Sequence, residues 1–247
     1  MRDCWPVTFK AALAFALLVG VVPIAADDGV VLINQSKAVA GSVTPGDLPG
    51  FPVTITRRGS FKLSGNLTVT DPNVDVINIK ADHVTLNLNG FTIQGPMDLC
   101  ANKVVPTWCY DRTAGTGVRA LYSPGAYATD VAVLNGSVRA LDFGVVLVYG
   151  SRAERLSVQN NRSGGLTVDG GCIVSGNIVS RNGGHGLAAY GCIVTGNHIS
   201  FNEGYGLEIT DSTVWSNNIV DGNNSNGDQV RGRGVDGGGN YCYPGGC

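Results

Sequence analysis

Short apolar runs alternate with clusters of glycine and asparagine through most of the chain. The segment 191–210, GCIVTGNHISFNEGYGLEIT, follows the segment 171–190, GCIVSGNIVSRNGGHGLAAY, without a gap. Each contains three apolar runs, which are separated by Gly-Asn and by Asn-x-Gly-x-Gly. No window keeps a 3.6-residue apolar period over about ten residues, which excludes a helical repeat. The pattern therefore predicts three short strands in each repeating unit.

The same unit continues on both sides of this pair. DSTVWSNNIVDGNNSNGDQV extends it over 211–230, and the steps Gly165-Leu166, Gly144-Val145 and Gly117-Val118 mark it earlier in the chain. Strands this short cannot bury an apolar face alone, whereas stacked units bury a continuous core. We therefore expect an all-β fold, a single-stranded parallel β-helix of about seven coils with three short strands per coil.

The repeat also predicts how the chain is divided. Residues 1–26 have a basic start followed by an apolar run, which predicts a secretory signal peptide with cleavage after Ala26; a retained N-terminal anchor is the alternative. We expect an N-terminal cap over 27–59, the β-helix over 60–230 with a loop insertion over 95–116, and a C-terminal cap over 231–247. Caps are expected because the open ends of a parallel stack pair readily with other chains.

Composition and charge narrow the classes of partner. Glycine accounts for 36 of 247 residues, which suits a β protein with many tight turns. The net charge of −2 leaves no basic stripe, so a nucleic-acid partner is not expected. No membrane span is expected after removal of the signal peptide. The predicted location is secreted or periplasmic.

The cysteines and asparagines have predicted structural roles. Cys4 would leave with the signal peptide, and an exported chain with six remaining cysteines suggests disulfides. We predict two pairs, and a third pair could either bond or only stack because its members occupy the same place in consecutive repeats. The predicted pairs are Cys100–Cys109 and Cys242–Cys247, and the open pair is Cys172 and Cys192. Asn177, Asn197 and Asn217 are expected to form a structural ladder at one turn.

The stretches GSFKLSGNLTV and INIKADHVTLNLNGFTI, followed by the glycine-rich repeats, resemble the right-handed parallel β-helix proteins of the pectate-lyase-like superfamily. The resemblance covers roughly residues 55–240 and lies in the repeat pattern more than in catalytic motifs. It implies a right-handed coil. The superfamily includes polysaccharide lyases, polygalacturonases, uronate epimerases and phage tailspikes, so the resemblance leaves the activity open.

Gly184-His185-Gly186 is similar to the Gly-His-Gly of the polygalacturonases. The slot between the two glycines is filled differently in different coils, as at a variable turn position, which favours a scaffold role for His185. The family's neighbouring Asn-Thr-Asp and Asp-Asp motifs are missing at repeat distance. His185 nevertheless remains a catalytic candidate. The slot holds Thr116, Phe143, Gly164, His185 and Tyr205.

A second row of residues follows the Gly-Leu strand at nearly equal spacing. If the coils stack in register, these rings and carboxylates form one exposed ladder that could bind a glycan, because aromatic faces stack on sugars and carboxylates accept hydrogen bonds. Asp169 and Asp211 would lie ~9.6 Å apart from the strand spacing, near the upper end of the roughly 6.5–9.5 Å found in inverting glycosidases. They are therefore catalytic candidates. Alternatively, Asp and Tyr simply end strands at solvent-facing corners. The row is Tyr122, Tyr149, Asp169, Tyr190 and Asp211.

We expect no metal site and no cofactor. His83 and His198 lie in different coils without a second ligand nearby. Calcium at Asp221–Asp228 is the one alternative left open, because this segment has oxygen ligands at alternating positions. Asn226 stands where a calcium loop has its glycine, and no Glu closes the loop.

The predicted function is an exported β-helix protein that binds a polysaccharide or cell-surface glycan along one face. Processing of that glycan, as a polysaccharide lyase, uronate epimerase or glycoside hydrolase, is left open. The alternative is a non-catalytic structural or adhesive surface solenoid, whose repeats supply rigidity alone.

Overall fold

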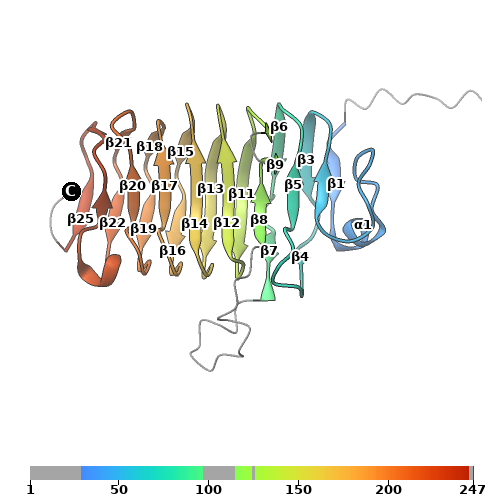
Figure 1. Ribbon diagram of the computed structural model, residues 1–247, viewed down its shortest axis with the longest axis horizontal. Coiled ribbons are helices and arrows are strands. Elements are labelled where there is room, and N and C mark those ends of the chain that lie inside the picture. The colour runs from blue at the N-terminus through green and yellow to red at the C-terminus, as the bar shows by residue number, and fades with distance from the viewer. Residues whose placement is uncertain (1–28, 97–114, 124–125, 245–246) are drawn as a thin grey trace, which may run out of the picture.

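The computed structural model describes residues 29–96, 115–123, 126–244 and 247. Their strands stack side by side into a rod, with a short helix at the N-terminal end and the C-terminus at the other (Figure 1). All strands pair in parallel, except in one small hairpin. The predicted all-β parallel solenoid is therefore confirmed.

One strand from each coil forms the sheet that we call sheet B. It has eight strands, so the rod has about eight turns and not seven. The additional turn arises because residues 27–59, expected as a cap, already supply the first strand. The strands are β2 (Val53–Ile55), β5 (Ile77–Ile79), β8 (Thr116–Arg119), β12 (Phe143–Val148), β14 (Gly164–Asp169), β17 (Leu187–Tyr190), β20 (Leu207–Ile209) and β23 (Val230–Arg231).

The remaining strands, apart from those of the small hairpin, form sheet A, which has two rows. The rows are joined where β11 (Ala132–Arg139) and β13 (Arg152–Gln159) run through both. Each later coil thus contributes three strands, as predicted. The first row also contains β1 (Val31–Ile33), β3 (Gly59–Leu63), β6 (Val84–Asn87), β15 (Ile173–Ser175), β18 (Ile193–Thr195), β21 (Val214–Ser216) and β24 (Val235–Asp236). The second also contains β4 (Leu67–Thr68), β7 (Thr92–Gln94), β16 (Ile178–Ser180), β19 (His198–Ser200), β22 (Ile219–Asp221) and β25 (Tyr241–Tyr243).

Both segments predicted as caps supply strands to the stack. At the N-terminal end, β1 and β2 pair with the following coil and flank the helix α1 (Gln35–Ala40). The Asn34 side chain accepts a hydrogen bond from the Lys37 N–H at 2.9 Å, which satisfies one of the free amides at the start of this helix. At the other end, β24 and β25 pair with the preceding coil, after the 3-10 turn η3 (Asn224–Asn226).

Apolar side chains alternate along each strand and point into the rod. In sheet B, Val145, Leu166, Leu187 and Leu207 form one fully buried column, because strand register places them directly over one another. Each such burial stabilises the fold by about 1.5–3 kcal/mol. This repeated column explains why Gly-Leu steps recur at a nearly constant spacing.

Buried asparagines form the predicted ladder, but with one different member. Asn177 Nδ2 donates to Asn197 Oδ1 at 2.9 Å, and Asn197 Nδ2 donates to Asn218 Oδ1 at 3.0 Å. The prediction of Asn217 was wrong, because the 211–230 unit contains one extra residue before this turn. Asn217 instead has a φ of 54°, in the left-handed position that Gly196 occupies in the previous coil.

A second buried ladder lies at the next turn, where Asn182 donates to Asn202 and Asn202 donates to Asn223. In both ladders the side-chain amide also donates to a main-chain carbonyl of the preceding coil, as Asn202 does to Val179. Buried backbone groups at the turns are thereby satisfied without water. These asparagines are structural.

Two disulfides are present in the described part of the chain. Cys242 bonds Cys247, as predicted, and Cys172 bonds Cys192 across consecutive coils, which resolves the alternative that the sequence left open. Cys100 and Cys109 lie outside the described residues, as do most of the 95–116 insertion and the predicted signal peptide. Within the described ranges, no helix has the length and apolar character needed to cross a membrane.

Candidate functional site

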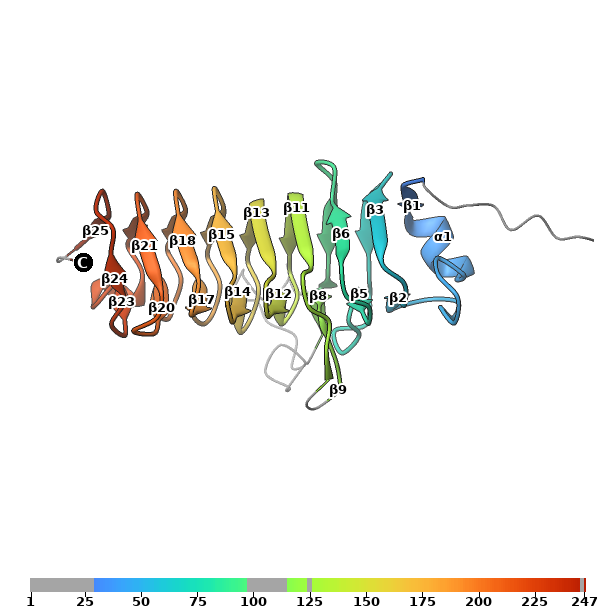
Figure 2. The ribbon, with the colours of Figure 1, turned by 90° about the horizontal axis from the view of Figure 1, so that it is seen from above.

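The outer face of sheet B carries polar side chains along much of its length. Outward positions on its strands include Asn78, Arg119, Thr167 and Glu208, which alternate with buried Ile, Val and Leu. Val146 and Ala188 take the equivalent positions on β12 and β17. The hairpin of β9 (Leu121–Ser123) and β10 (Ala126–Tyr127) projects from this side of the rod (Figure 2). The face therefore has a raised edge at the third coil.

Strand register brings together part of the predicted row of rings and carboxylates. Asp169 pairs with Tyr190 in the next coil and with Val148 in the previous one. Tyr149 lies one residue beyond Val148, so it is outside this row by strict register. The prediction that all five residues share one column was wrong, because successive coils differ in length by one residue. Since neighbouring side chains on a strand point to opposite faces, a shift of one residue takes a side chain out of the column.

Tyr149 nevertheless lies beside Asp169. Its ring lies against the backbone of Gly170, where an added Cβ would be 2.3 Å from Tyr149 Cδ1. On another side the edge of Tyr127 contacts it, with the ring centroids 5.5 Å apart and the planes at 89°. The Tyr149 side chain is still 46% exposed. It is thus an immobilised aromatic surface that faces solvent.

The other two members of the predicted row lie elsewhere. Tyr122 belongs to β9, which pairs with β10 in a separate two-stranded sheet and so has no position in sheet B. Asp211 follows Thr210 into the turn after β20 and is exposed. Because Asp169 is on a strand and Asp211 is on a turn, the two carboxylates do not occupy equivalent positions. The strand register therefore does not place Asp169 and Asp211 as a carboxylate pair of the kind found in inverting glycosidases.

His185 connects its own coil to the next one through its two ring nitrogens. Nδ1 accepts a hydrogen bond from the Tyr205 N–H at 3.1 Å, and Nε2 lies 3.0 Å from Glu208 Oε2. An accepting Nδ1 places the proton of the neutral ring on Nε2, from which it is donated to Glu208. Since both nitrogens are engaged within the protein, the geometry favours a positioning role for His185.

Glu208 is the centre of this cluster, and the sequence analysis did not select it. Besides His185, its carboxylate contacts Arg231 Nη1 at 3.8 Å, and the guanidinium lies over the Tyr205 ring at 5.7 Å. A signal was available in the sequence. Glu208 directly follows the Gly206-Leu207 step, and the residue after such a step always points outward from sheet B.

Tyr190 lies between Glu208 and Asp169. Partial burial raises the pKa of the Tyr190 phenol above its ordinary value of 10.0, and the negative charge of Glu208 and a hydrogen bond to it act in the same direction. Asp169 adds to this effect, whereas Arg231 opposes it. The phenol is therefore protonated at physiological pH and can donate a hydrogen bond.

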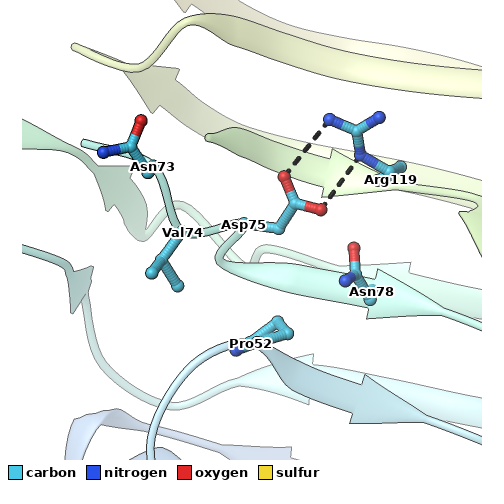
Figure 3. A pocket seen from close by; sticks show the side chains of 6 residues that line it. All are labelled: Pro52, Asn73, Val74, Asp75, Asn78 and Arg119. Carbon is cyan, nitrogen blue, oxygen red and sulfur yellow. Dashed lines mark hydrogen bonds and ion pairs between the residues drawn. The ribbon is translucent and has the colours of Figure 1, made fainter. Parts of the chain in front are cut away.

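A depression of about 370 Å³ lies at the other end of the same sheet. Pro52, Asn73, Asn78 and the Asp75–Arg119 pair surround it (Figure 3). Asp75 Oδ2 is 3.0 Å from Arg119 Nε, and Asp75 Oδ1 also accepts from the Thr116 N–H at 2.8 Å. Asn78 Oδ1 is buried and has no hydrogen-bond partner among the described residues. Sequence analysis missed this site because its residues come from three separate coils.

Among the residues that the structure describes, no three His, Cys, Asp or Glu side chains lie close enough together to hold a metal ion. In the segment considered for calcium, the Asn223 side chain is part of the second asparagine ladder and Asp221 Oδ1 lies 3.1 Å from His198 Nε2. These two oxygen donors are thus already used within the fold.

The family model described as "Right handed beta helix region" matches residues 114–237, which is half of the chain. The chain belongs to this family, and the right-handed coil implied by its repeats is thereby shown. A search of curated proteins gives no significant match.

A search of solved structures gives two matches. The mannuronan C-5 epimerase AlgE4 A-module of Azotobacter vinelandii is 11% identical, with a TM-score of 0.37 over 82% of this chain and 70% of that chain. The AlgE6 A-module of the same organism is 12% identical, with a TM-score of 0.30 over 78% of this chain and 83% of that chain.

Proposed function

We propose that this protein binds a polysaccharide on the outer face of sheet B. The observation that carries the proposal is the cluster of Tyr149, Asp169 and Tyr190 on adjacent coils, where an immobilised exposed ring and a half-buried phenol flank a carboxylate. Rings of this kind stack on the apolar faces of sugars. Carboxylate and phenol groups hydrogen-bond the hydroxyls.

The regular spacing of the coils suits a polymeric ligand. Equivalent outward positions recur about every 4.8 Å along the rod, so an extended chain of sugars meets a new set of side chains at each coil. The depression around Asn78 lies on the same sheet and has an unused buried amide oxygen. It supports contacts with the polymer at a second point.

The test is binding to a panel of neutral, acidic and amino polysaccharides, measured by glycan array and by isothermal titration calorimetry. Tyr149→Ala and Tyr190→Ala are each expected to weaken binding by roughly five- to tenfold, as lost ring contacts do. Tyr241→Ala is the matched control, because Tyr241 is 58% exposed on the other sheet. Equal binding by all three variants and the unaltered protein would remove the proposal. Reducing ends and unsaturated products are followed in parallel to detect turnover.

A second candidate function, a structural or adhesive solenoid, is favoured by one observation on sheet A. Ile173, Ile193, Val214 and Val235 form an exposed column of β-branched side chains on successive coils. Contiguous exposed apolar surface is typical of interaction sites. This candidate is tested by sedimentation of the unaltered protein and of an Ile193→Asp variant. It requires that the unaltered protein self-associates and that the variant does not.

A further inference from the structure

We propose that the ligand of the Tyr149–Asp169–Tyr190 site is a glycan that carries protonated amino groups, a polymer of amino sugars. This inference rests on the proposed function and names the substrate class of the same site. It depends on three features of the described residues: Asp169 lacks a hydrogen-bond or ion-pair partner, two rings lie beside it, and the charges around it are mainly negative.

Asp169 differs from the other half-buried acids of the rod. Asp75 pairs with Arg119, Asp142 with Arg162 at 2.8 Å, and Glu208 with His185. By contrast, the Asp169 carboxylate has no hydrogen bond and no ion pair with any residue in the described ranges. A partly desolvated carboxylate without a partner is costly in the free protein, so this position favours a ligand that supplies a cation or donors.

The two rings beside Asp169 favour a cation over a neutral donor. Tyr190 is its direct neighbour in register, and Tyr149 covers Gly170, the next residue along the chain. The face of a Tyr ring attracts an ammonium group within about 6 Å. An amine placed between these rings would thus interact with one carboxylate and with up to two aromatic faces.

The surrounding charges disfavour an acidic sugar. The Asp130 N–H donates to the Tyr149 carbonyl, and Asp130 Oδ2 lies 2.7 Å from His83 Nδ1. Glu208 lies on the far side of Tyr190 and already engages Arg231. Because the nearby Arg231 is already paired with Glu208, a uronate carboxylate at this site would meet repulsion from Asp169.

The experiment compares three oligosaccharides of equal length, made of glucosamine, N-acetylglucosamine or galacturonate. Binding is measured by isothermal titration calorimetry at a mildly acidic pH, where the glucosamine amines are protonated. We expect the glucosamine oligomer to bind about tenfold more tightly than the N-acetylated one, as one partly buried ion pair allows. Added salt should weaken only the glucosamine complex, because the ion pair is screened.

Asp169→Asn is expected to reduce glucosamine binding to the level of the N-acetylated oligomer and to leave the latter unchanged within about twofold. Asp169→Glu should retain the preference, which separates the role of the charge from folding. Asp211→Asn is the matched control and should change nothing, because Asp211 lies on the turn outside this row.

Two outcomes overturn the inference while the proposed function survives: tighter or equal binding of the galacturonate oligomer, or a glucosamine preference that persists in Asp169→Asn. Binding of a lysine oligomer with the same dependence on Asp169 also overturns it, since the site would then recognise the amine without the sugar. If none of the three oligosaccharides binds, the inference fails, and the proposed function fails with it only if the wider polysaccharide panel is also silent.

Discussion

His185 Nε2 and Glu208 Oε2 lie 3.0 Å apart on neighbouring coils, and the other ring nitrogen of His185 accepts the Tyr205 amide. This contact orients Glu208 toward the Tyr190 phenol, which lies in the same coil as His185 and hydrogen-bonds Glu208. On the outer face of sheet B, His185 thus positions Glu208, and Glu208 contacts Tyr190. Each of these contacts can be tested by a single substitution.

The first prediction concerns the ring of Tyr149. Gly170→Ala should displace this ring, because the added Cβ would lie 2.3 Å from Cδ1, and should weaken glycan binding several-fold. Gly171→Ala is the matched control: both glycines have positive φ values, 76° and 67°, but Gly171 has nothing within 4 Å of an added Cβ. Each variant should lose about 1 kcal/mol of stability from the left-handed backbone. Loss of binding in both would show that backbone strain, and not the ring, is responsible.

The second prediction concerns the ionisation of Tyr190. Its pKa is raised above 10.0 in the folded protein, mainly by burial and then by Glu208. The protonated phenol therefore contributes stability that is complete below pH 10 and is lost as the pH rises through the folded pKa. Glu208→Gln should lower the pKa of Tyr190 toward its ordinary value without reaching it, since burial remains.

This shift is measured by tyrosinate absorbance, with Tyr190→Phe identifying the component that belongs to Tyr190. Glu203→Gln is the control, because Glu203 is exposed on a turn and does not contribute to the pKa of Tyr190. An unchanged titration in Glu208→Gln would contradict the assigned contact.

The third prediction concerns the first asparagine ladder. Asn197→Ala should destabilise the fold by about 2–4 kcal/mol, because it leaves the Asn177 N–H and Nδ2 groups without their buried acceptor. Asn217→Gly should change the free energy of unfolding by less than about 0.5 kcal/mol, since Asn217 is exposed and glycine suits its positive φ. Urea unfolding followed by circular dichroism measures both. Similar losses in the two variants would argue against the ladder.

The fourth prediction concerns the Cys172–Cys192 disulfide, which closes a loop of one coil. Reduction should lower the free energy of unfolding by about 3 kcal/mol, the value expected for a loop of this length. The double variant Cys172→Ala/Cys192→Ala should lose most of its sensitivity to reductant, whereas Cys242→Ala/Cys247→Ala should retain it. Denaturant unfolding with and without reductant gives the comparison, and full sensitivity in the first double variant would mean that this bond does not stabilise the rod.

The sequence by itself determined the stacked architecture, because the Gly-Leu steps and Gly-Asn turns recur at a nearly constant period and short strands can bury their apolar face only against the next copy. The same recurrence predicted buried asparagines at the turns and placed Cys172 over Cys192. It also placed Asp169 and Tyr190 at equivalent positions, which the register confirms.

Only the tertiary structure decided which outward side chains meet. One extra residue in the 211–230 unit exchanges Asn217 for Asn218 in the ladder, and the β9–β10 hairpin removes Tyr122 from sheet B. The repeat places Glu208 and Arg119 on the outer face, but it does not indicate their contacts with His185 and Asp75, which join different coils. The physical reason is the two-residue period of a strand: a shift of one residue turns a side chain to the opposite face, so the site depends on the register of each coil.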